Sequence, residues 1–218
     1  KVVRWIPKDD GPLQDPYNQY VHFVLTLSDG PSNTSGQVRQ LVLSDMRKFA
    51  SVTISKTDKL HLHESVSDLG PNPLDKKFNV KIFYDRVHIK GAMPIKSALL
   101  DQTTISGIGN IYSDEILWET NIHPLSPAKN VPEKKFKEMF EVMRKILKFS
   151  IKHGGDSKSD YRNIYGEKGG FQNFHKVYGK KKEKCAKKGC QSKKRAIIDR
   201  IVVKGRSSHF CPVHQILY

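Results

Sequence analysis

The first third of the chain shows the short apolar and alternating runs that are typical of β-strands. Residues 21–27 (VHFVLTL) predict one strand, and the turn-forming residues 28–33 close it. Residues 38–43 predict its hairpin partner, and residues 50–54 predict a further short strand. The start of the chain is therefore expected to be β-structure.

The middle of the chain carries apolar residues at spacings of three and four, which is the period of an amphipathic helix. The predicted helices cover residues 78–89, 94–100, 113–120 and 133–153. The last of them places Phe136, Met139 and Met143 on one face, which we interpret as core packing rather than as a cofactor-binding stripe. Strand character returns at 196–203, so the pattern predicts an α+β fold.

The charge of the chain suggests a partner. Its 218 residues include 38 basic and 22 acidic residues, which gives a formal net charge of +16. Thirteen Lys or Arg lie between residues 176 and 206, against only Glu183 and Asp199. Such a segment attracts a polyanion through counterion release, although a solvated basic tail or a localisation signal would carry the same charge.

The distribution of apolar residues argues against a membrane or secreted protein. No apolar run reaches the ~18 residues that a membrane span needs. Residues 1–10 lack the apolar core of a signal peptide. We therefore expect no membrane partner and no secretion, and a location in the cytoplasm or nucleoid, or in the nucleus of a eukaryote.

The three cysteines lie close together near the end of the chain, which points to a metal rather than to disulfides. Cys185 and Cys190 form one pair, and Cys211 and His214 form a second pair beyond a segment with hairpin character. Four such donors suit one structural Zn²⁺ ion in tetrahedral coordination, whereas His209 lies too close to Cys211 to be a strong candidate. The alternative is three free thiols and a surface histidine.

The turn between the second and third predicted helices has the features of an anion site. Gly107 and Gly109 allow a tight turn, and Asn110 is a natural N-cap for the helix that follows. The amides at the start of that helix would then face a phosphate. By itself, this pattern fits a tight helical connection equally well.

The segment 96–124 resembles the helix-two-turn-helix signature of the formamidopyrimidine-DNA glycosylase and endonuclease VIII family. Residues 69–74 resemble its interdomain segment, residues 160–179 its base-capping loop and the following strand, and residues 201–211 its zinc-finger hairpin. The resemblance covers nearly the whole chain. It implies a partial N-terminal β-sandwich at 1–68, a linker at 69–75, a helical domain at 76–175 with the helix-two-turn-helix at 95–124 and the capping loop at 156–171, and a zinc finger at 176–218.

This resemblance implies a bifunctional DNA glycosylase and AP lyase of base-excision repair. Members of the family flip a damaged base out of double-stranded DNA. The capping loop resembles the form that recognises oxidised purines, namely 8-oxoguanine and formamidopyrimidines, after whose removal the abasic strand is cleaved by elimination. The expected partner is duplex DNA with a damaged base or an abasic site, bound by a monomer.

The resemblance also assigns roles in DNA binding. Lys96 and Asn110 match positions that grip phosphates, and Arg206 matches the zinc-finger arginine; a solvated lysine and one more charge in a basic run are the alternatives for Lys96 and Arg206. Arg47 would contact the orphaned base and Phe49 would wedge between base pairs, although a phenylalanine after a strand is usually core. The full DNA-binding set is Arg47, Phe49, Lys96, Gly109, Asn110, Tyr112, Lys204 and Arg206, and the base-capping residues are Asp160, Tyr161 and Gly169.

The chain departs from the family pattern at its start and in the spacing of its cysteine pairs. The family's nucleophile is an N-terminal proline followed by a glutamate, and Lys1-Val-Val-Arg4 matches an internal strand instead. We therefore expect no catalytic residue in this chain and no activity of the chain alone, either because it belongs to a longer enzyme or because it is a non-catalytic lesion-binding protein. The usual Cys-x-x-Cys pairs are Cys-x4-Cys and Cys-x-x-His here, which leaves four zinc ligands.

Two further alternatives concern substrate and mechanism. An endonuclease VIII-like glycosylase for oxidised pyrimidines is the other enzyme that the resemblance allows. Glu115, near the start of the third predicted helix, is either a functional carboxylate or a structural partner, and we favour the structural interpretation.

Overall fold

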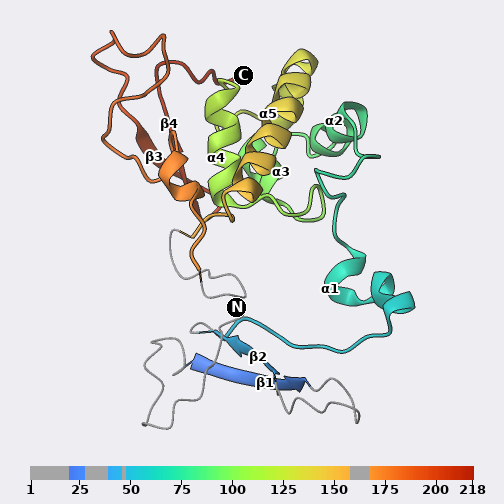
Figure 1. The fold of residues 1–218 in the computed structure, drawn as a ribbon. Helices are drawn as coiled ribbons and strands as arrows, with labels where there is room; N and C mark the ends of the chain where they lie inside the picture. The colour runs from blue at the N-terminus through green and yellow to red at the C-terminus, as the bar shows by residue number, and fades with distance from the viewer. Residues whose placement is uncertain (1–19, 28–38, 46–47, 158–166) are drawn as a thin grey trace, which may run out of the picture. The chain divides into compact units, whose positions relative to one another are not determined.

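A computed structural model describes residues 20–27, 39–45, 48–157 and 167–218 (Figure 1). The chain divides into two compact units, one of residues 1–55 and 152–173 and the other of residues 56–151 and 174–218. Helices dominate the second unit, and both units contain a short antiparallel sheet. The chain therefore has the predicted α+β character.

The described residues form twelve helices, 3₁₀ turns and strands. In chain order they are β1 (Val21–Leu27), β2 (Arg39–Ser44), η2 (Thr57–Leu62), α1 (Glu64–Ser67), α2 (Val80–His88), α3 (Ile95–Leu100), α4 (Asn110–Glu119), η3 (Ala128–Asn130), α5 (Glu133–Lys152), η4 (Phe171–Phe174), β3 (Asp199–Val203) and β4 (Arg206–Phe210).

The first unit contains the hairpin pair β1 and β2, which confirms the two predicted strands. Val24 lies opposite Val42 in this antiparallel ladder, and a bulge interrupts the register between Val21 and Phe23. The predicted strand at 50–54 is wrong. Residues 48–56 have no regular structure and exposed side chains, because no neighbouring strand among the described residues completes a ladder with them.

The second unit is built on a core shared by four helices. The predicted apolar face of α5 is confirmed as core, since Phe136, Met139 and Met143 are fully buried. They pack against side chains of α2, α3 and α4, namely Phe83, Val87, Ile95, Ala98, Leu99, Ile116 and Leu117. None of the described helices combines the length and the hydropathy that crossing a membrane requires.

The segment predicted as a linker is packed against the turn between α3 and α4. The amide of Gly70 donates to the carbonyl of Gln102 at 2.7 Å. A Cβ atom at Gly70 would lie 2.6 Å from the backbone carbon of Thr104, so this close approach requires glycine. The start of the helical unit is thereby fixed to the turn that the sequence analysis singled out.

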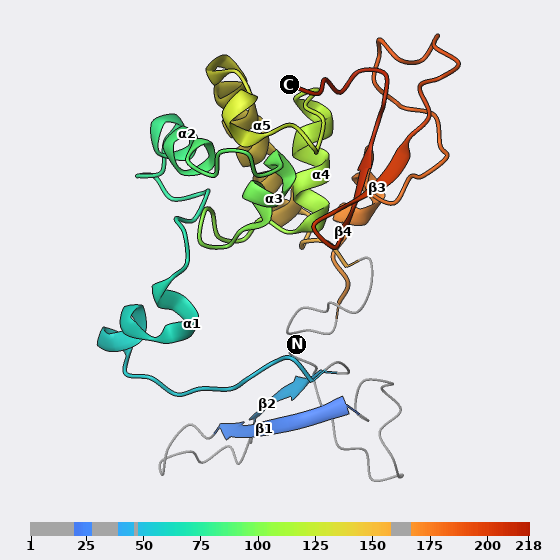
Figure 2. The ribbon, with the colours of Figure 1, turned by 180° about the vertical axis from the view of Figure 1, so that it is seen from behind.

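The hairpin of β3 and β4 lies beside α4, as the opposite views of Figures 1 and 2 show. Its two-residue turn consists of Lys204 and Gly205, with φ values of 44° and 78°. Both residues are therefore left-handed, as the type I′ turns that join twisted strands require. Behind the hairpin, a second small core contains Trp118, Val177, Cys185, Cys190, Ala196, Ile198 and Cys211.

Candidate nucleic-acid interface

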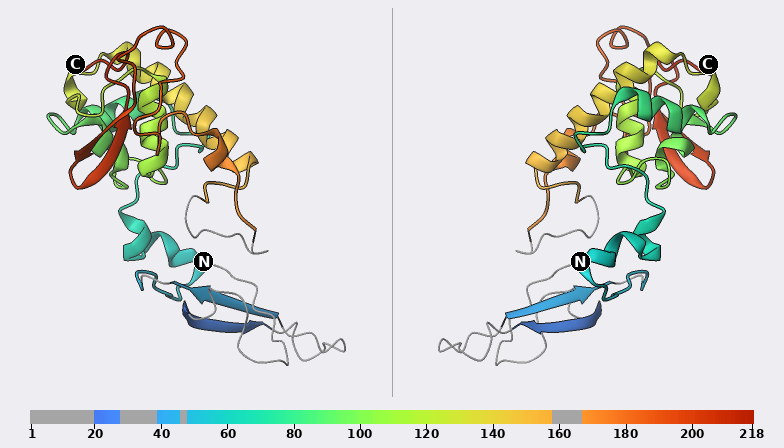
Figure 3. Two further views of the ribbon diagram at one scale, coloured as in Figure 1. Left: turned by 90° about the vertical axis from the view of Figure 1, so that its left-hand side faces the viewer. Right: turned by 90° about the vertical axis from the view of Figure 1, so that its right-hand side faces the viewer.

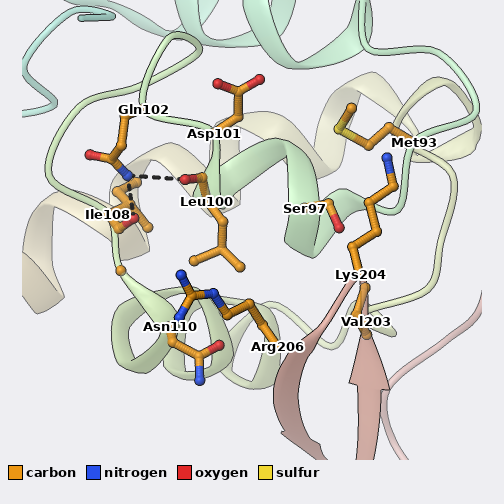
Figure 4. A pocket seen from close by; sticks show the side chains of 11 residues that line it. Met93, Ser97, Leu100, Asp101, Gln102, Ile108, Asn110, Val203, Lys204 and Arg206 are labelled. Carbon is orange, nitrogen blue, oxygen red and sulfur yellow. Dashed lines mark hydrogen bonds between the residues drawn. The ribbon is translucent and has the colours of Figure 1, made fainter.

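The side chain of Gln102 forms hydrogen bonds to both sides of the turn between α3 and α4. Its carbonyl oxygen accepts from the amide of Gly107 at 2.8 Å, and its amide group donates to the carbonyls of Leu100 and Ile108 at 3.0 and 2.9 Å (Figure 4). Gly107 itself has a φ of 83°, which favours glycine. Gln102 was not among the predicted site residues, although a polar residue two positions after the end of a predicted helix is a recognisable capping signal.

The helix α4 begins at Asn110, and its N-cap is Gly109. The prediction that Asn110 is the N-cap is therefore wrong, and no side chain caps this end. Glycine leaves the first turn of α4 accessible at the surface, where the amides of a helix N-terminus carry a partial positive charge.

A pocket of about 510 Å³ lies between the start of α4, one side of α3 and the turn of the β3–β4 hairpin (Figure 4). It brings together four predicted DNA-binding residues, Gly109, Asn110, Lys204 and Arg206. The side chain of Arg206 extends toward Asn110, whereas that of Lys204 extends toward Met93 (Figure 4). The remaining lining residues are Met93, Ser97, Leu100, Asp101, Gln102, Ile108 and Val203.

The pocket is positively charged despite the presence of Asp101. The ammonium of Lys90 lies 2.8 Å from this carboxylate and, with the Thr103 hydroxyl and amide, holds the pKa of Asp101 at about 2. Among the described residues, Lys204 and Arg206 form no ion pair, and both are exposed. The uncompensated charge of the pocket is therefore cationic.

Two buried oxygen atoms of the pocket lack a hydrogen-bond partner among the described residues: the hydroxyl of Ser97 and the side-chain carbonyl of Asn110. Buried polar atoms without partners are uncommon and call for an explanation. The amide nitrogen of Asn110 lies 3.5 Å from the hydroxyl of Ser207, which can donate as well as accept. Rotation of the amide would therefore turn an N–H donor toward the pocket, and the Ser97 hydroxyl offers a second donor.

Lys96 does not face the pocket. Its side chain is 0% exposed, and its ammonium lies 2.5 Å from the carboxylate of Asp114 on α4. Burial lowers the pKa of Lys96, and the charge of Asp114 opposes this shift. Lys96 also reaches the Ser113 hydroxyl and the Asn110 carbonyl, at 3.3 and 3.4 Å.

The structure therefore places Lys96 in a buried ion pair, which rules out the alternative of a solvated lysine, and the phosphate contact of Lys96 stays a prediction. The helix α3 turns this position toward α4, where the Asp114 carboxylate compensates the buried charge. The sequence pattern could not distinguish these cases, because a lysine on a short helix has the same spacing whichever way it points.

Asp114 joins the two helices to the hairpin. One carboxylate oxygen accepts from the Ser208 hydroxyl at 2.8 Å, and the other accepts from the backbone amide of His209 at 2.8 Å. The His209 ring nitrogen also lies 3.3 Å from this second oxygen. Because Asp114 lies one turn after Asn110, and Ser208 lies two residues after Arg206, this buried carboxylate fixes the two ends of the pocket relative to each other.

Glu115 has a structural role, as favoured from the sequence. Its buried carboxylate accepts from the backbone amides of Lys176, Val177 and Tyr178, at distances between 2.9 and 3.1 Å. The helix α4 is thereby anchored to the segment that leads into the hairpin.

Tyr112, a predicted DNA-binding residue, lies outside the pocket that contains Arg206. It lines a second pocket, and its hydroxyl lies 2.7 Å from that of Ser150 on α5.

The first unit carries the remaining predicted residues. Phe49 is 82% exposed, so it is not a core residue of the described structure. The carboxylate of Asp45 accepts from the amides of Phe49 and Ala50 at 2.8 and 2.7 Å, which orders the backbone at this position. Arg47 lies outside the described residues.

The base of the predicted capping loop is closely packed. The amide of Gly169 donates to the Ser157 hydroxyl at 2.8 Å, and a Cβ atom at Gly169 would collide with the carbonyl oxygens of Gly154 and Gly155. Only glycine fits there. Asp160 and Tyr161 lie outside the described residues.

The four predicted metal ligands form one cluster. The sulfur atoms of Cys185, Cys190 and Cys211 and the Nδ1 atom of His214 all lie within 4.8 Å of one another. The Cys190 sulfur lies 3.9 Å from that of Cys211 and 3.3 Å from His214 Nδ1. A tetrahedral zinc site with Zn–S of ~2.3 Å and Zn–N of ~2.0 Å has edges of ~3.8 and ~3.5 Å, so these residues fit the ion.

The surroundings of the cluster prepare His214 for a metal. Its Nε2 atom lies 3.1 Å from the Trp118 carbonyl, so a proton on Nε2 leaves Nδ1 free to bind the metal. Burial lowers the pKa of His214, which keeps the ring neutral. Burial also raises the pKa of Cys190 to about 12 and raises that of Cys211, so without a metal these thiols stay protonated at neutral pH. His209 is bonded to Asp114 and is not part of the cluster.

Replacement of Asp114 by Asn should destabilise the second unit by about 3–5 kcal/mol, because it leaves the Lys96 charge buried without compensation. The double variant Lys96→Met with Asp114→Asn should recover part of this loss. Urea unfolding measures both. The control is Asp85→Asn, which removes the exposed partner of Lys81 and should change stability little. A loss in Asp114→Asn no larger than in this control would contradict the role of the buried pair.

The chain should bind one equivalent of Zn²⁺ and release protons as it does so, because thiols with a raised pKa must deprotonate to become ligands. Zinc retention should therefore fall as the pH is lowered. Zinc content after gel filtration at several pH values measures this, and Trp118 fluorescence reports on the site because its ring lies 5.5 Å from that of His214. Cys190→Ala should lose the metal and His214→Cys should keep it. Equal zinc content in both variants would argue against the cluster.

The comparisons with known proteins agree with this geometry. Residues 69–162 match the model of the formamidopyrimidine-DNA glycosylase H2TH domain. A formamidopyrimidine-DNA glycosylase of Streptococcus pneumoniae is 33% identical over 201 residues, which cover 92% of this chain and 68% of that protein. The Bacillus subtilis relative of the same name is 36% identical over 198 residues, covering 91% and 66%.

Solved structures of the same family are similar to this chain as well. A complex of the Lactococcus lactis enzyme with DNA containing an abasic site has a TM-score of 0.76 at 34% identity, covering 95% of this chain and 69% of that one. A complex of MutM with DNA containing carbocyclic 8-oxo-G has a TM-score of 0.70 at 37% identity, covering 81% and 62%. The chain therefore belongs to the formamidopyrimidine-DNA glycosylase family, whose members are DNA glycosylases that act on damaged DNA.

Proposed function

We propose that the pocket between α3, the start of α4 and the β3–β4 turn binds phosphates of damaged duplex DNA, with Arg206 and Asn110 as the principal contacts. The observation that carries the proposal is that these residues, 96 positions apart in the sequence, line one pocket with an excess of positive charge. The helix N-terminus, the Ser97 hydroxyl and Lys204 add donors on the same wall. Phosphate oxygens are strong acceptors and match this set.

Lys96 and Asp114 act as positioning residues in this proposal. The buried pair holds α3 against α4, and Asp114 holds the hairpin at Ser208 and His209. Phosphates that contact both Asn110 and Arg206 require a fixed distance between α4 and the hairpin. The pair therefore supports the grip without contacting DNA.

The zinc ion would have a structural role. Cys185, Cys190, Cys211 and His214 would hold it, and it would fasten the loops before β3 to the end of β4. This supports a zinc finger at 176–218 that presents Lys204 and Arg206 on a rigid turn. Phe49 in the first unit is exposed, as a wedge between base pairs has to be.

The reaction proposed for the protein is excision of an oxidised purine followed by cleavage of the abasic strand. The described part of the predicted base-capping loop is its base, where only glycine fits at Gly169, and the resemblance associates this loop with 8-oxoguanine and formamidopyrimidines. The relatives that were solved in complex with abasic-site DNA and with carbocyclic 8-oxo-G DNA belong to the same family. An oxidised-pyrimidine substrate is the alternative that the test below distinguishes.

The chain should bind duplexes with 8-oxoguanine or an abasic site more tightly than an undamaged duplex of the same sequence. Fluorescence anisotropy on these duplexes, and on one with an oxidised pyrimidine, measures the preference. Equal affinity for all of them would refute the proposed function, and a preference for the pyrimidine lesion would favour the alternative substrate. Borohydride added to the same mixtures should trap no Schiff base, because no catalytic residue is expected in this chain, and a trapped adduct would contradict that expectation.

Replacement of Arg206 by Ala should weaken binding to damaged and undamaged DNA alike and lower the slope of log Kd against log salt by about one. The reason is that one phosphate contact releases about one counterion. Arg200→Ala removes an equally exposed charge from β3, outside the pocket, and is the control. An unchanged slope in Arg206→Ala would remove this residue from the phosphate contacts.

A further inference from the structure

A second basic surface surrounds the metal cluster. Residues 180–195, which we call the lysine-rich loops, contain nine basic residues and a single acid, Glu183. Lys180 and Lys187 pair with Glu183 and Glu119, at 3.4 and 3.7 Å. The other seven are exposed and form no ion pair among the described residues; they are Lys181, Lys182, Lys184, Lys188, Lys193, Lys194 and Arg195.

The lysine-rich loops are ordered structure and not a loose tail. The amide of Cys185 donates to the Ala196 carbonyl at 2.8 Å, and the amide of Cys190 donates to the Lys187 carbonyl at 2.8 Å. Cys185, Cys190 and Ala196 are buried in the small core around Trp118. Seven like charges are thus held close together on a fixed backbone, where they repel one another.

The loops lie away from the pocket that holds Arg206. The helix α4 starts at the pocket with Asn110 and ends at Glu119, where the Lys187 ammonium reaches the Glu119 carbonyl at 2.6 Å and lies 4.8 Å from the centre of the Trp118 ring system. A helix of ten residues spans ~15 Å. Figures 1 and 3 show these loops at the opposite end of the hairpin from the turn between β3 and β4.

The composition of the lysine-rich loops indicates which kind of polyanion they could bind. Residues 180–195 contain no aromatic residue, so they offer no surface on which the bases of a single strand could stack. They also contain no exposed large hydrophobic side chain, which the centre of a protein interface would need. Charge alone remains as the means of recognition, and it suits the regular phosphates of a duplex.

We propose that the lysine-rich loops bind the phosphates of duplex DNA outside the lesion grip, as a second and separate contact surface. The proposal rests on the proposed function in so far as DNA is the partner. The phosphates belong either to the flank of the same duplex or to a second duplex. In both cases the loops add affinity without reading the lesion.

The test compares two variants with equal changes in charge. The loop variant replaces Lys181, Lys184, Lys188 and Lys193 by Gln, and the control variant replaces the exposed α5 lysines Lys134, Lys137, Lys145 and Lys148 by Gln. Zinc content and thermal unfolding establish that both variants are folded. Salt slopes are measured on three kinds of duplex with an abasic site. The site has about 20 base pairs on both sides, about 20 on one side and about 4 on the other, or about 4 on both sides. An arm of 4 base pairs spans ~14 Å, which is less than the length of α4.

The expected result on the long duplex is a slope lower by about 2 or more for the loop variant, at about 0.9 per lost phosphate contact, and a smaller change for the control. If the flank is the partner, the wild-type slope falls when one particular arm is shortened, and the slope of the loop variant does not. If a second duplex is the partner, arm length has no effect, but wild-type protein on an immobilised damaged duplex captures a labelled duplex and the loop variant does not.

Two outcomes would overturn the proposal. One is a loop variant that equals the control in salt slope and in duplex capture, which would leave the lysines as a solvated surface. The other is the same loss of slope on the duplex with both arms shortened, together with no capture of a second duplex by the wild-type protein, which would place the lysines in the lesion grip. A failure of the proposed function gives a different result, because the wild-type protein would then show no preference for the abasic site. The salt slopes of the loop variant and the control variant could still be compared.

Discussion

The carboxylate of Asp114 is the contact on which the arrangement of the helical unit depends. It is fully buried, it compensates the Lys96 ammonium, and it accepts from the hydroxyl of Ser208 and the amide of His209. Three elements that are distant in sequence, α3, α4 and β4, therefore meet at one charge. A buried charge tolerates little displacement, because each lost hydrogen bond leaves a polar group without compensation. The geometry of the pocket follows from this contact.

The helix α4 connects two kinds of chemistry. At its start, Gly109 and Asn110 leave the helix N-terminus accessible to an anion, beside Arg206. At its end, Trp118 packs against the metal cluster and contacts Lys187 of the lysine-rich loops. Along its length, Asp114 and Glu115 hold the hairpin and the segment before it. One helix of ten residues thus fixes the proposed phosphate site, the candidate metal cluster and a basic surface relative to one another.

Much of the site was predictable because its residues have local signals. The metal ligands are recognisable by their type and spacing, and the structure brings all four together. Gly107 and Gly109 predict a tight turn between α3 and α4, and the structure contains it, with Gly107 at a φ of 83°. The strand at 50–54 was mispredicted because a strand requires a partner, and a run of apolar residues does not reveal whether one is present. The burial of Lys96 was not predicted for a related reason, since it depends on the direction in which α3 faces.

The sequence by itself determined the family, the α+β character, the amphipathic face of α5, the metal ligand set and the excess of positive charge. These properties reside in residue type and short spacing, so no long-range contact is needed to detect them. Only the tertiary structure decided that Lys96 is buried, that Asp114 joins the helices to the hairpin, and that Asn110 and Arg206 share a pocket. Pairing across about a hundred residues depends on how helices and strands pack, and packing is a property of the folded chain alone.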